Sequence, residues 1–303
     1  MKYVITGSTG HISKSIVIAL VKEGHDVTVV TSKQDRAKEI ESLGAKEAVG
    51  SVEDVAFLTK AFSGADAVYT MVPPAHDVAD WKGFIGQVGK NYAAAIKAAS
   101  VKYVVNLSSI GAHMAEGCGP VSGLNRVEAA LNALEGVSIK HLRPAYFYYN
   151  LLNNISLVKN MGIIGGNFSV ADKKFPIVDP ADIANIATRY LLTPDFTGHT
   201  IQYIASDETS TDEIASTLGK AIDKPDLKWV TFTDEQSLQG AIQAGLPEEL
   251  AKNYTEMGHA IYTGDMFEDY WHHRPASLGK VKLNDFAKTF AGAYNNKTAV
   301  AAH

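Results

Sequence analysis

Two alternating hydrophobic patterns run along the first half of the chain. Short runs of β-branched and aromatic residues alternate with longer segments in which apolar residues recur every three or four positions. The first long segment puts Ile12, Ile16 and Leu20 on one face of a helix that ends at Gly24. The patterns predict strands at 3–6, 27–30, 48–49, 67–72, 103–107 and 139–142, and helices at 12–23, 35–43, 55–62, 84–99 and 124–134. Because a helix returns the chain after each strand, we expect an α/β fold with a doubly wound parallel sheet.

The pattern changes after Pro144. A helix is predicted at 180–192 and a strand at 200–205 that returns to the sheet, whereas the glycine-rich stretch 162–166 is predicted as a loop. One further strand is predicted around 228–232. We therefore expect a domain of residues 1–150 built on this sheet, completed by 180–205, and a smaller C-terminal α+β lobe of residues 151–179 and 206–303.

Composition and charge narrow the function classes. The chain has 303 residues, of which 46% are hydrophobic and 20% charged, so a packed core is expected rather than disorder. No run approaches the roughly 18 apolar residues of a membrane helix, and the formal net charge of -5 gives no basic footprint for nucleic acid. The single cysteine, Cys118, cannot form an internal disulfide, and the first residues lack the pattern of a secretory signal, so we expect a cytoplasmic protein.

A glycine turn, Gly7-Ser8-Thr9-Gly10, directly follows the first predicted strand. Glycines at a strand-to-helix turn let the backbone bend tightly and let a pyrophosphate approach the amides at the helix N-terminus, where the helix dipole favours anions. The same residues could form a simple turn without a ligand, but their place in a β-α-β unit favours dinucleotide binding. Ser13 replaces the third glycine of the usual fingerprint and is still small enough for close packing.

The end of the second predicted strand indicates which dinucleotide binds. It contains Thr31-Ser32-Lys33 and then Arg36, with Asp35 as the nearest acid. An NAD site commonly has an acid there for the ribose hydroxyls, whereas a 2'-phosphate needs hydrogen-bond donors and positive charge. We therefore expect NADP(H), with NAD(H) less favoured. The other interpretation is that Lys33 and Arg36 belong to the solvated start of the next helix, where cations are mildly unfavourable.

Several motifs carry a family resemblance. They are Gly7-x-x-Gly10, Val72-Pro73-Pro74, Asn106-Leu107-Ser108-Ser109-Ile110-Gly111-Ala112, Leu142-Arg143-Pro144-Ala145 with Phe147 and Asn150, and Pro180-Ala181-Asp182-Ile183-Ala184. Together they resemble the NmrA-like family of atypical short-chain dehydrogenases/reductases, which implies a Rossmann-type NAD(P)-binding fold. Members include quinone reductases, triphenylmethane-dye reductases and regulators that bind NADP(H) without evident turnover.

The resemblance implies cofactor contacts by position. The pyrophosphate would lie against Gly7, Thr9, Gly10, His11 and Ile12. The adenosine phosphate would contact Ser32 and Lys33, and the adenine and ribose edge would contact Met71, Val72 and Pro73. Ser108 and Pro144, at the ends of the fifth and sixth predicted strands, complete the expected cofactor site.

One helix departs from the usual pattern of short-chain dehydrogenases. Those enzymes use a tyrosine and a lysine four residues later, and the lysine lowers the pKa of the phenol so that it can pass a proton to the substrate. The corresponding segment 120–128 contains neither residue, so carbonyl reduction or sugar epimerisation through that pair is disfavoured. Hydride transfer itself needs no protein acid, because the nicotinamide supplies the electrons and the protein supplies position. A quinone-like or conjugated acceptor suits such a site.

Two further residues are candidates for catalysis. Ser109 lies at the carboxyl end of a predicted strand, where open parallel sheets bind ligands, and His113 follows shortly and could donate a proton near the nicotinamide. The alternatives are that Ser108 and Ser109 cap a turn or helix and that His113 is merely exposed.

Aromatic residues after the sixth predicted strand could line a pocket for a flat ligand. The candidates are Tyr146, Tyr148, Tyr149 and Asn150, with Trp81 added from the 73–83 loop. Packing between the lobes is the other use of such rings. The adjacent histidines within 269–275 lack the spacing of metal ligands, so no metal site is expected.

The leading hypothesis is an NADP(H)-binding oxidoreductase that passes hydride directly to a quinone-like or conjugated small molecule. The alternative is a non-catalytic NADP(H)-sensing regulatory protein of the NmrA type. The expected partner is a small-molecule acceptor, and the sequence leaves a homodimer open.

Overall fold

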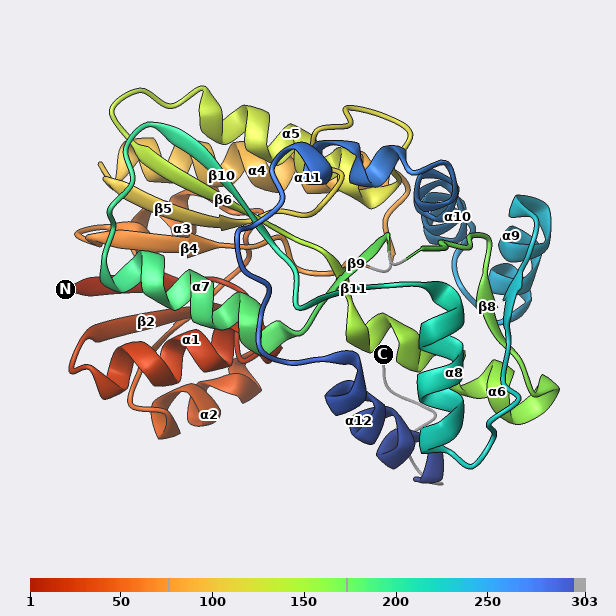
Figure 1. Ribbon diagram of the computed structural model, residues 1–303. Coiled ribbons are helices and arrows are strands. Elements are labelled where there is room, and N and C mark those ends of the chain that lie inside the picture. Colours follow the sequence, from red (N-terminus) through yellow and green to blue (C-terminus); the bar gives the residue numbers. More distant parts are fainter. Residues whose placement is uncertain (76, 173, 297–303) are drawn as a thin grey trace.

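A seven-stranded sheet forms the centre of the molecule (Figure 1). The computed structural model describes residues 1–75, 77–172 and 174–296. Across the sheet, the strands are β10 (His199–Ile204), β6 (Ser138–Pro144), β5 (Tyr103–Leu107), β4 (Ala67–Thr70), β1 (Lys2–Ile5), β2 (Asp26–Thr31) and β3 (Lys46–Val49). All neighbours pair in parallel, so the predicted α/β fold class is confirmed. The strand order reverses between β1 and β4, and open sheets bind ligands outside the carboxyl ends of the strands at such a point.

Helices cover both faces of this sheet. One face carries α1 (His11–Lys22), α2 (Ala37–Ser42) and α7 (Pro180–Leu192), and the other carries α3 (Val55–Phe62), α4 (Trp81–Ala98) and α5 (Pro120–Asn132), as Figure 1 shows. Two starts differ from the prediction. α4 begins at Trp81 instead of residue 84, because the Asp80 side chain caps it by accepting the amide of Gly83. α5 begins at Pro120 instead of 124, since proline fits the first turn of a helix.

The alternation along β1 explains the two-sided core. Val4 belongs to the hydrophobic cluster under α3 and α4, whereas Tyr3 and Ile5 belong to the cluster under α1 and α7. All three side chains are fully buried. The Tyr3 hydroxyl donates a hydrogen bond of 3.0 Å to the carbonyl oxygen of Leu191 on α7. This contact ties a helix from the second half of the chain onto the first strand, and β10 then pairs with β6, as expected for 200–205.

The remaining elements lie beyond the carboxyl edge of the sheet. They include β7 (Tyr146–Phe147), η2 (Tyr148–Asn154), α6 (Ile155–Met161), β8 (Ile164–Gly166), β9 (Phe175–Val178), β11 (Asp207–Thr209), α8 (Thr211–Ala221), β12 (Trp229–Thr231), α9 (Asp234–Gln243), α10 (Glu248–Thr263), η3 (Asp265–Phe267), α11 (Glu268–His272) and α12 (Leu283–Asn295). The loop predicted at 162–166 is wrong in part, because 164–166 form β8, which pairs with β12. The backbone of β12 approaches Gly165 more closely than a Cβ would allow, so glycine permits this pairing although it gives no hydrophobic signal.

None of the described helices combines the length and the hydropathy that crossing a membrane requires.

A buried ionic network joins the sheet to the last part of the chain. Arg143 on β6 donates two hydrogen bonds to Glu128 on α5, from Nε at 3.0 Å and from Nη2 at 2.7 Å. The same guanidinium donates to the Tyr203 hydroxyl at 3.0 Å and to Asp269 Oδ2 at 2.9 Å. Because the side chains of Arg143 and Glu128 are only 9% and 7% exposed, removing either partner would leave a buried charge without its main counterion.

We predict that Glu128→Leu lowers the free energy of unfolding by about 3 kcal/mol, because the Arg143 guanidinium would stay buried without its bidentate partner. Urea denaturation followed by circular dichroism measures the change. The double variant Glu128→Leu/Arg143→Met should recover part of the loss, since it removes both charges together. A single variant as stable as the wild type would show that the pair does not stabilise the fold in this way.

Candidate functional site

The turn between β1 and α1 has a backbone conformation that requires glycine at position 7. Gly7 has a φ of +90°, and a Cβ added there would lie 2.5 Å from the Oγ of Ser13 and 2.8 Å from the Cγ of Met71. Ser8 follows with a φ of 54°, and its hydroxyl donates to Oγ1 of Thr31 at 3.0 Å. The turn is therefore held between the first helix, the end of β2 and the end of β4, with no room for a side chain at Gly7.

α1 starts from this turn with an open N-terminus. Its N-cap residue is Gly10, no side chain among the described residues caps the helix, and the first turn contains no acidic residue. The Gly10 amide donates to the Gly7 carbonyl at 3.2 Å, which closes the turn. The first-turn amides, including those of His11 and Ile12, are therefore available to an anion at the positive end of the helix dipole.

The three residues predicted to contact an adenosine phosphate differ in their surroundings. Ser32, Lys33 and Arg36 are all exposed, just after β2. Within the described part of the chain, the Lys33 ammonium has no hydrogen-bond or ion-pair partner. Arg36 instead forms an ion pair with Glu39 at 2.9 Å. The structure thus brings a free cation and a paired cation to the edge beside the glycine turn.

Glu39 is a residue of this edge that the sequence analysis missed. Its carboxylate accepts hydrogen bonds from Lys14 Nζ at 2.8 Å, from Thr9 Oγ1 at 2.8 Å and from Arg36 Nη1 at 2.9 Å. These contacts, with Lys14 contributing most, lower the pKa of Glu39 to about 2. The only signal in the sequence was its helical spacing of three residues from Arg36.

The residues after β4 form the other wall of the turn. Met71 packs its side chain over Gly7, and its carbonyl accepts a hydrogen bond of 2.7 Å from the Tyr92 hydroxyl. Val72 and Pro73 follow and are partly exposed. Nearby, Tyr69 is fully buried on β4, and its hydroxyl has no hydrogen-bond partner among the described residues. Burial raises the pKa of this phenol, so it stays protonated and can donate a hydrogen bond.

The candidates at the ends of β5 and β6 are largely buried. The Ser108 hydroxyl donates to Glu128 at 2.5 Å, and the carbonyl of Pro144 accepts from the amide of Ile110 at 2.8 Å. Ser109 is partly exposed beside them. His113 is partly buried, and its Nδ1 has no partner in the described part of the chain. Ser108 is therefore already engaged by the ionic network, whereas His113 retains an unused ring nitrogen.

Tyr149 is a predicted pocket residue whose ring lies beside the start of α1. Its ring is 6.0 Å from the ring of His11 at the start of α1 and 5.0 Å from that of Phe147. Tyr149 is 38% exposed, and Asn150 beside it is partly exposed. Burial raises the pKa of the Tyr149 phenol to about 12, and the nearby Tyr254 adds to this shift. Tyr149 therefore connects the glycine turn to the aromatic residues beyond the sheet.

The other two tyrosines of this run pack against later elements, Tyr148 fully buried and Tyr146 partly exposed. The Tyr148 side chain is fully buried and stacks on Phe286 of α12 at 5.1 Å. The Tyr146 ring contacts those of Phe168 and Phe175 at 6.1 and 5.1 Å. Both rings thus hold the later elements against the sheet, the packing role that the sequence analysis left open.

Trp81 and Tyr254 form a second aromatic contact at this edge. Trp81 starts α4 rather than lying in a loop, and it is only 7% exposed. Its ring meets that of Tyr254 on α10 edge-on at 5.2 Å, and its amide donates to Glu249 at 3.0 Å. Tyr254 is 44% exposed and lies near Tyr149. The pattern of α10 gave no sign that this tyrosine would reach two of the predicted pocket residues.

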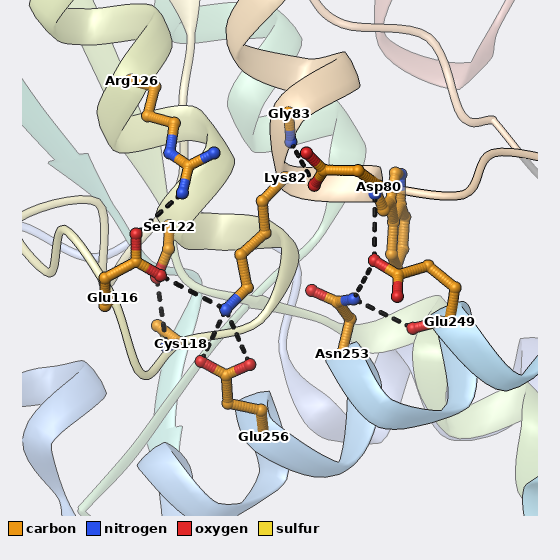
Figure 2. Close-up of polar contacts among 11 residues, drawn as sticks. Asp80, Lys82, Gly83, Glu116, Cys118, Ser122, Arg126, Glu249, Asn253 and Glu256 are labelled. Atoms are coloured by element: carbon orange, nitrogen blue, oxygen red, sulfur yellow. Dashed lines mark hydrogen bonds and ion pairs between the residues drawn. The ribbon is translucent and has the colours of Figure 1, made fainter.

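A polar cluster joins α10 to the start of α4 and to the loop before α5 (Figure 2). Lys82 donates to both carboxylate oxygens of Glu256 at 2.8 Å and lies 3.5 Å from Glu116, which also pairs with Arg126 at 2.7 Å.

Cys118 is buried in the loop that contains Glu116. Burial raises the pKa of its thiol to about 12, so it is not a nucleophile at neutral pH. No group of three or more potential metal ligands occurs among the residues that the structure describes.

Comparisons with known proteins identify the family and the fold. The sequence model of the NmrA-like family matches residues 2–278. An NAD(P)H azoreductase from Xenophilus azovorans is 24% identical over 294 residues, which cover 96% of this chain and 98% of that protein. An NADPH-dependent quinone oxidoreductase from Escherichia coli, solved with NADPH, has a TM-score of 0.79 at 19% identity, covering 95% of this chain and 99% of the other. The Citrobacter sp. triphenylmethane reductase with NADP(H) has a TM-score of 0.75 at 19% identity, with 95% and 99% covered. The Rossmann-type fold is thereby confirmed.

We predict that Gly7→Ala lowers the free energy of unfolding by about 2 kcal/mol or more, because the new Cβ adds a steric clash to the strain of a positive φ. Gly24→Ala is the matched control, since Gly24 has a φ of +79° and nothing within 4 Å of an added Cβ. That variant should lose only about 1 kcal/mol from backbone strain. Equal losses in urea denaturation would mean that the close approach of Ser13 and Met71 does not constrain the turn.

Proposed function

The chain belongs to the NmrA-like family, and we propose that it is an NADP(H)-dependent oxidoreductase whose cofactor binds at the carboxyl edge of the parallel sheet. The observation that carries the proposal is the turn at Gly7, which leaves no room for a side chain and leads into an uncapped helix N-terminus. A pyrophosphate needs such a close backbone approach and such free amides.

The residues around the turn fit this cofactor. The pyrophosphate would be held by Gly7, Thr9, Gly10, His11 and Ile12, the 2'-phosphate by Ser32, Lys33 and Arg36, and the remaining cofactor edge by Met71, Val72, Pro73, Ser108 and Pro144. The free Lys33 ammonium supports the 2'-phosphate assignment, since a dianion there gains an unpaired cation. The unpartnered Tyr69 hydroxyl supports a polar ligand near Met71, because a buried hydroxyl without a partner is costly. When bound, NADPH supplies two electrons and a proton as hydride.

We assign the acceptor to the aromatic residues beyond this edge. Tyr149 and Tyr254 expose part of their rings, and Trp81 supports Tyr254 from α4. Flat conjugated molecules bind such surfaces by stacking. The azoreductase, quinone oxidoreductase and triphenylmethane reductase named above have conjugated acceptors of this kind. In this assignment residues 1–150 with 180–205 hold the cofactor, and 151–179 with 206–303 form the substrate lobe. Residues 76, 173 and 297–303 of these ranges lie outside the described part of the chain.

The chain would act by positioning rather than by a tyrosine-lysine pair. α5 contains neither a tyrosine nor a lysine between residues 120 and 132. An acceptor that delocalises the incoming charge needs no strong protein acid during hydride transfer. We assign the proton supplied afterwards to His113, whose Nδ1 has no partner among the described residues, or to the partly exposed Ser109.

We predict that the purified protein oxidises NADPH steadily when a naphthoquinone, an azo dye or a triphenylmethane dye is added. Absorbance of NADPH and bleaching of the dye measure the two halves of the reaction. A folded protein that binds NADPH but reduces none of these acceptors would contradict the enzymatic function and favour an NADP(H)-sensing regulator. Such a regulator must bind NADP and NADPH with different affinities to change its state, and calorimetry distinguishes that case.

We predict that Lys33→Asp weakens NADPH binding about 10-fold more than NADH binding, because it replaces an unpaired cation by an anion beside the 2'-phosphate. Calorimetric titration with both dinucleotides measures the ratio. Lys60→Asp is the control for net charge, because Lys60 is also an exposed lysine and lies on α3, which covers the other face of the sheet. This variant should leave the ratio unchanged. An unaltered ratio in Lys33→Asp would refute the 2'-phosphate assignment.

A further inference from the structure

Glu39 holds the cationic edge of the glycine turn together. Its carboxylate accepts hydrogen bonds from Thr9 in the turn, from Lys14 on α1 and from Arg36 at the start of α2, each with a donor–acceptor distance of 2.9 Å or less. Arg36 Nη1 also lies 3.4 Å from Thr9 Oγ1, so the guanidinium rests against the turn itself. One carboxylate thus gathers donors from three separate segments.

The charges of this cluster do not cancel. Lys14 and Arg36 contribute two positive charges and Glu39 one negative charge, and both cations remain about half exposed, at 43% and 48%. Glu39 stays ionised at all ordinary pH values because its hydrogen bonds lower its pKa to about 2. An incoming phosphate would therefore meet one net positive charge from the cluster, plus Lys33, instead of three cations.

We propose that Glu39 is a specificity-determining residue that reduces the preference for NADPH over NADH. Its carboxylate occupies one edge of the Arg36 guanidinium and repels a 2'-phosphate, while it keeps Arg36 and Thr9 in place beside the turn. NADH carries no 2'-phosphate and escapes this repulsion. The proposal rests on the proposed function, since it concerns the same dinucleotide.

A purely structural role for Glu39 makes a different prediction. If the carboxylate only fastened α2 to the turn, its loss would weaken both dinucleotides equally and would lower thermal stability. If it acts on the phosphate, its loss must change the two affinities differently, and the difference must depend on salt, because Coulomb interactions near a surface are screened.

The test is Glu39→Gln, which keeps the size of the side chain and removes its charge. We expect the ratio of NADPH to NADH affinity to rise about five-fold, by calorimetry or cofactor fluorescence, with a smaller rise at high salt. Glu41→Gln is the matched control, because Glu41 is an exposed carboxylate on the same helix without a partner among the described residues, and its ratio should not change. An unchanged or lower ratio in Glu39→Gln overturns the proposal.

A second variant keeps the test decisive if Glu39→Gln folds poorly. Lys14→Gln leaves Glu39 and Arg36 in place and removes one cation, so the affinity ratio should fall, and a rise would overturn the proposal. Failure of the proposed cofactor site is a separate result, because the wild-type protein would then bind neither dinucleotide, and failure of the proposed activity is separate again, because the wild type would then bind NADPH without reducing any acceptor. Binding of both by the wild type with no response to Glu39→Gln would refute the role of Glu39 alone.

Discussion

The structure depends on the close approach of β1, α1 and β4 at Gly7. Here the backbone turns with a positive φ, and the space that a side chain would fill is taken by Ser13 and Met71. The first helix therefore begins directly at the carboxyl edge of the sheet, next to the reversal of the strand order. Because the helix has no cap of its own, its amides and dipole face the edge without an internal partner. The same turn brings Thr9 to Glu39 and His11 to Tyr149. The position of the turn therefore determines where both the charged residues and the aromatic residues of the candidate site lie.

Two ion pairs and one aromatic contact attach the later elements to this edge. The buried Arg143 guanidinium reaches from β6 to Asp269 on α11. Lys82 reaches from the start of α4 to Glu256 on α10 (Figure 2). The neighbouring Trp81 ring supports Tyr254 on the same helix. The ionic contacts fix orientation more than they add stability, since desolvation offsets much of their attraction. They hold the exposed rings of Tyr254 on α10 and Tyr149 after β6 at the same carboxyl edge of the sheet. In the proposed reaction the acceptor lies at this edge, because hydride passes to it directly.

The sequence predicted the strands of the sheet and the glycine turn, but it did not predict all residues of the candidate site. Alternating hydrophobic runs predicted the central strands because parallel strands are buried on both faces, and the glycine spacing marked the turn because only glycine fits there. Glu39 was missed because its three partners come together only in the folded chain. Tyr254 was missed because an aromatic residue on an amphipathic helix has the same pattern whether it packs in the core or borders a site. Tyr148 was placed in the pocket with its neighbours, although a single residue step turned its ring into the core against Phe286. β8 was not predicted, because two of its three residues are glycines and give no alternating hydrophobic pattern.

A crystal structure of the protein with NADP bound and a quinone-like acceptor present tests the central claim most directly. The account predicts that the pyrophosphate contacts the amides after Gly10, that the 2'-phosphate contacts Lys33, and that the acceptor lies against Tyr149 and Tyr254 over the nicotinamide. A dinucleotide bound away from the Gly7 turn, or side chains filling the space over the nicotinamide so that no acceptor can enter, would contradict it.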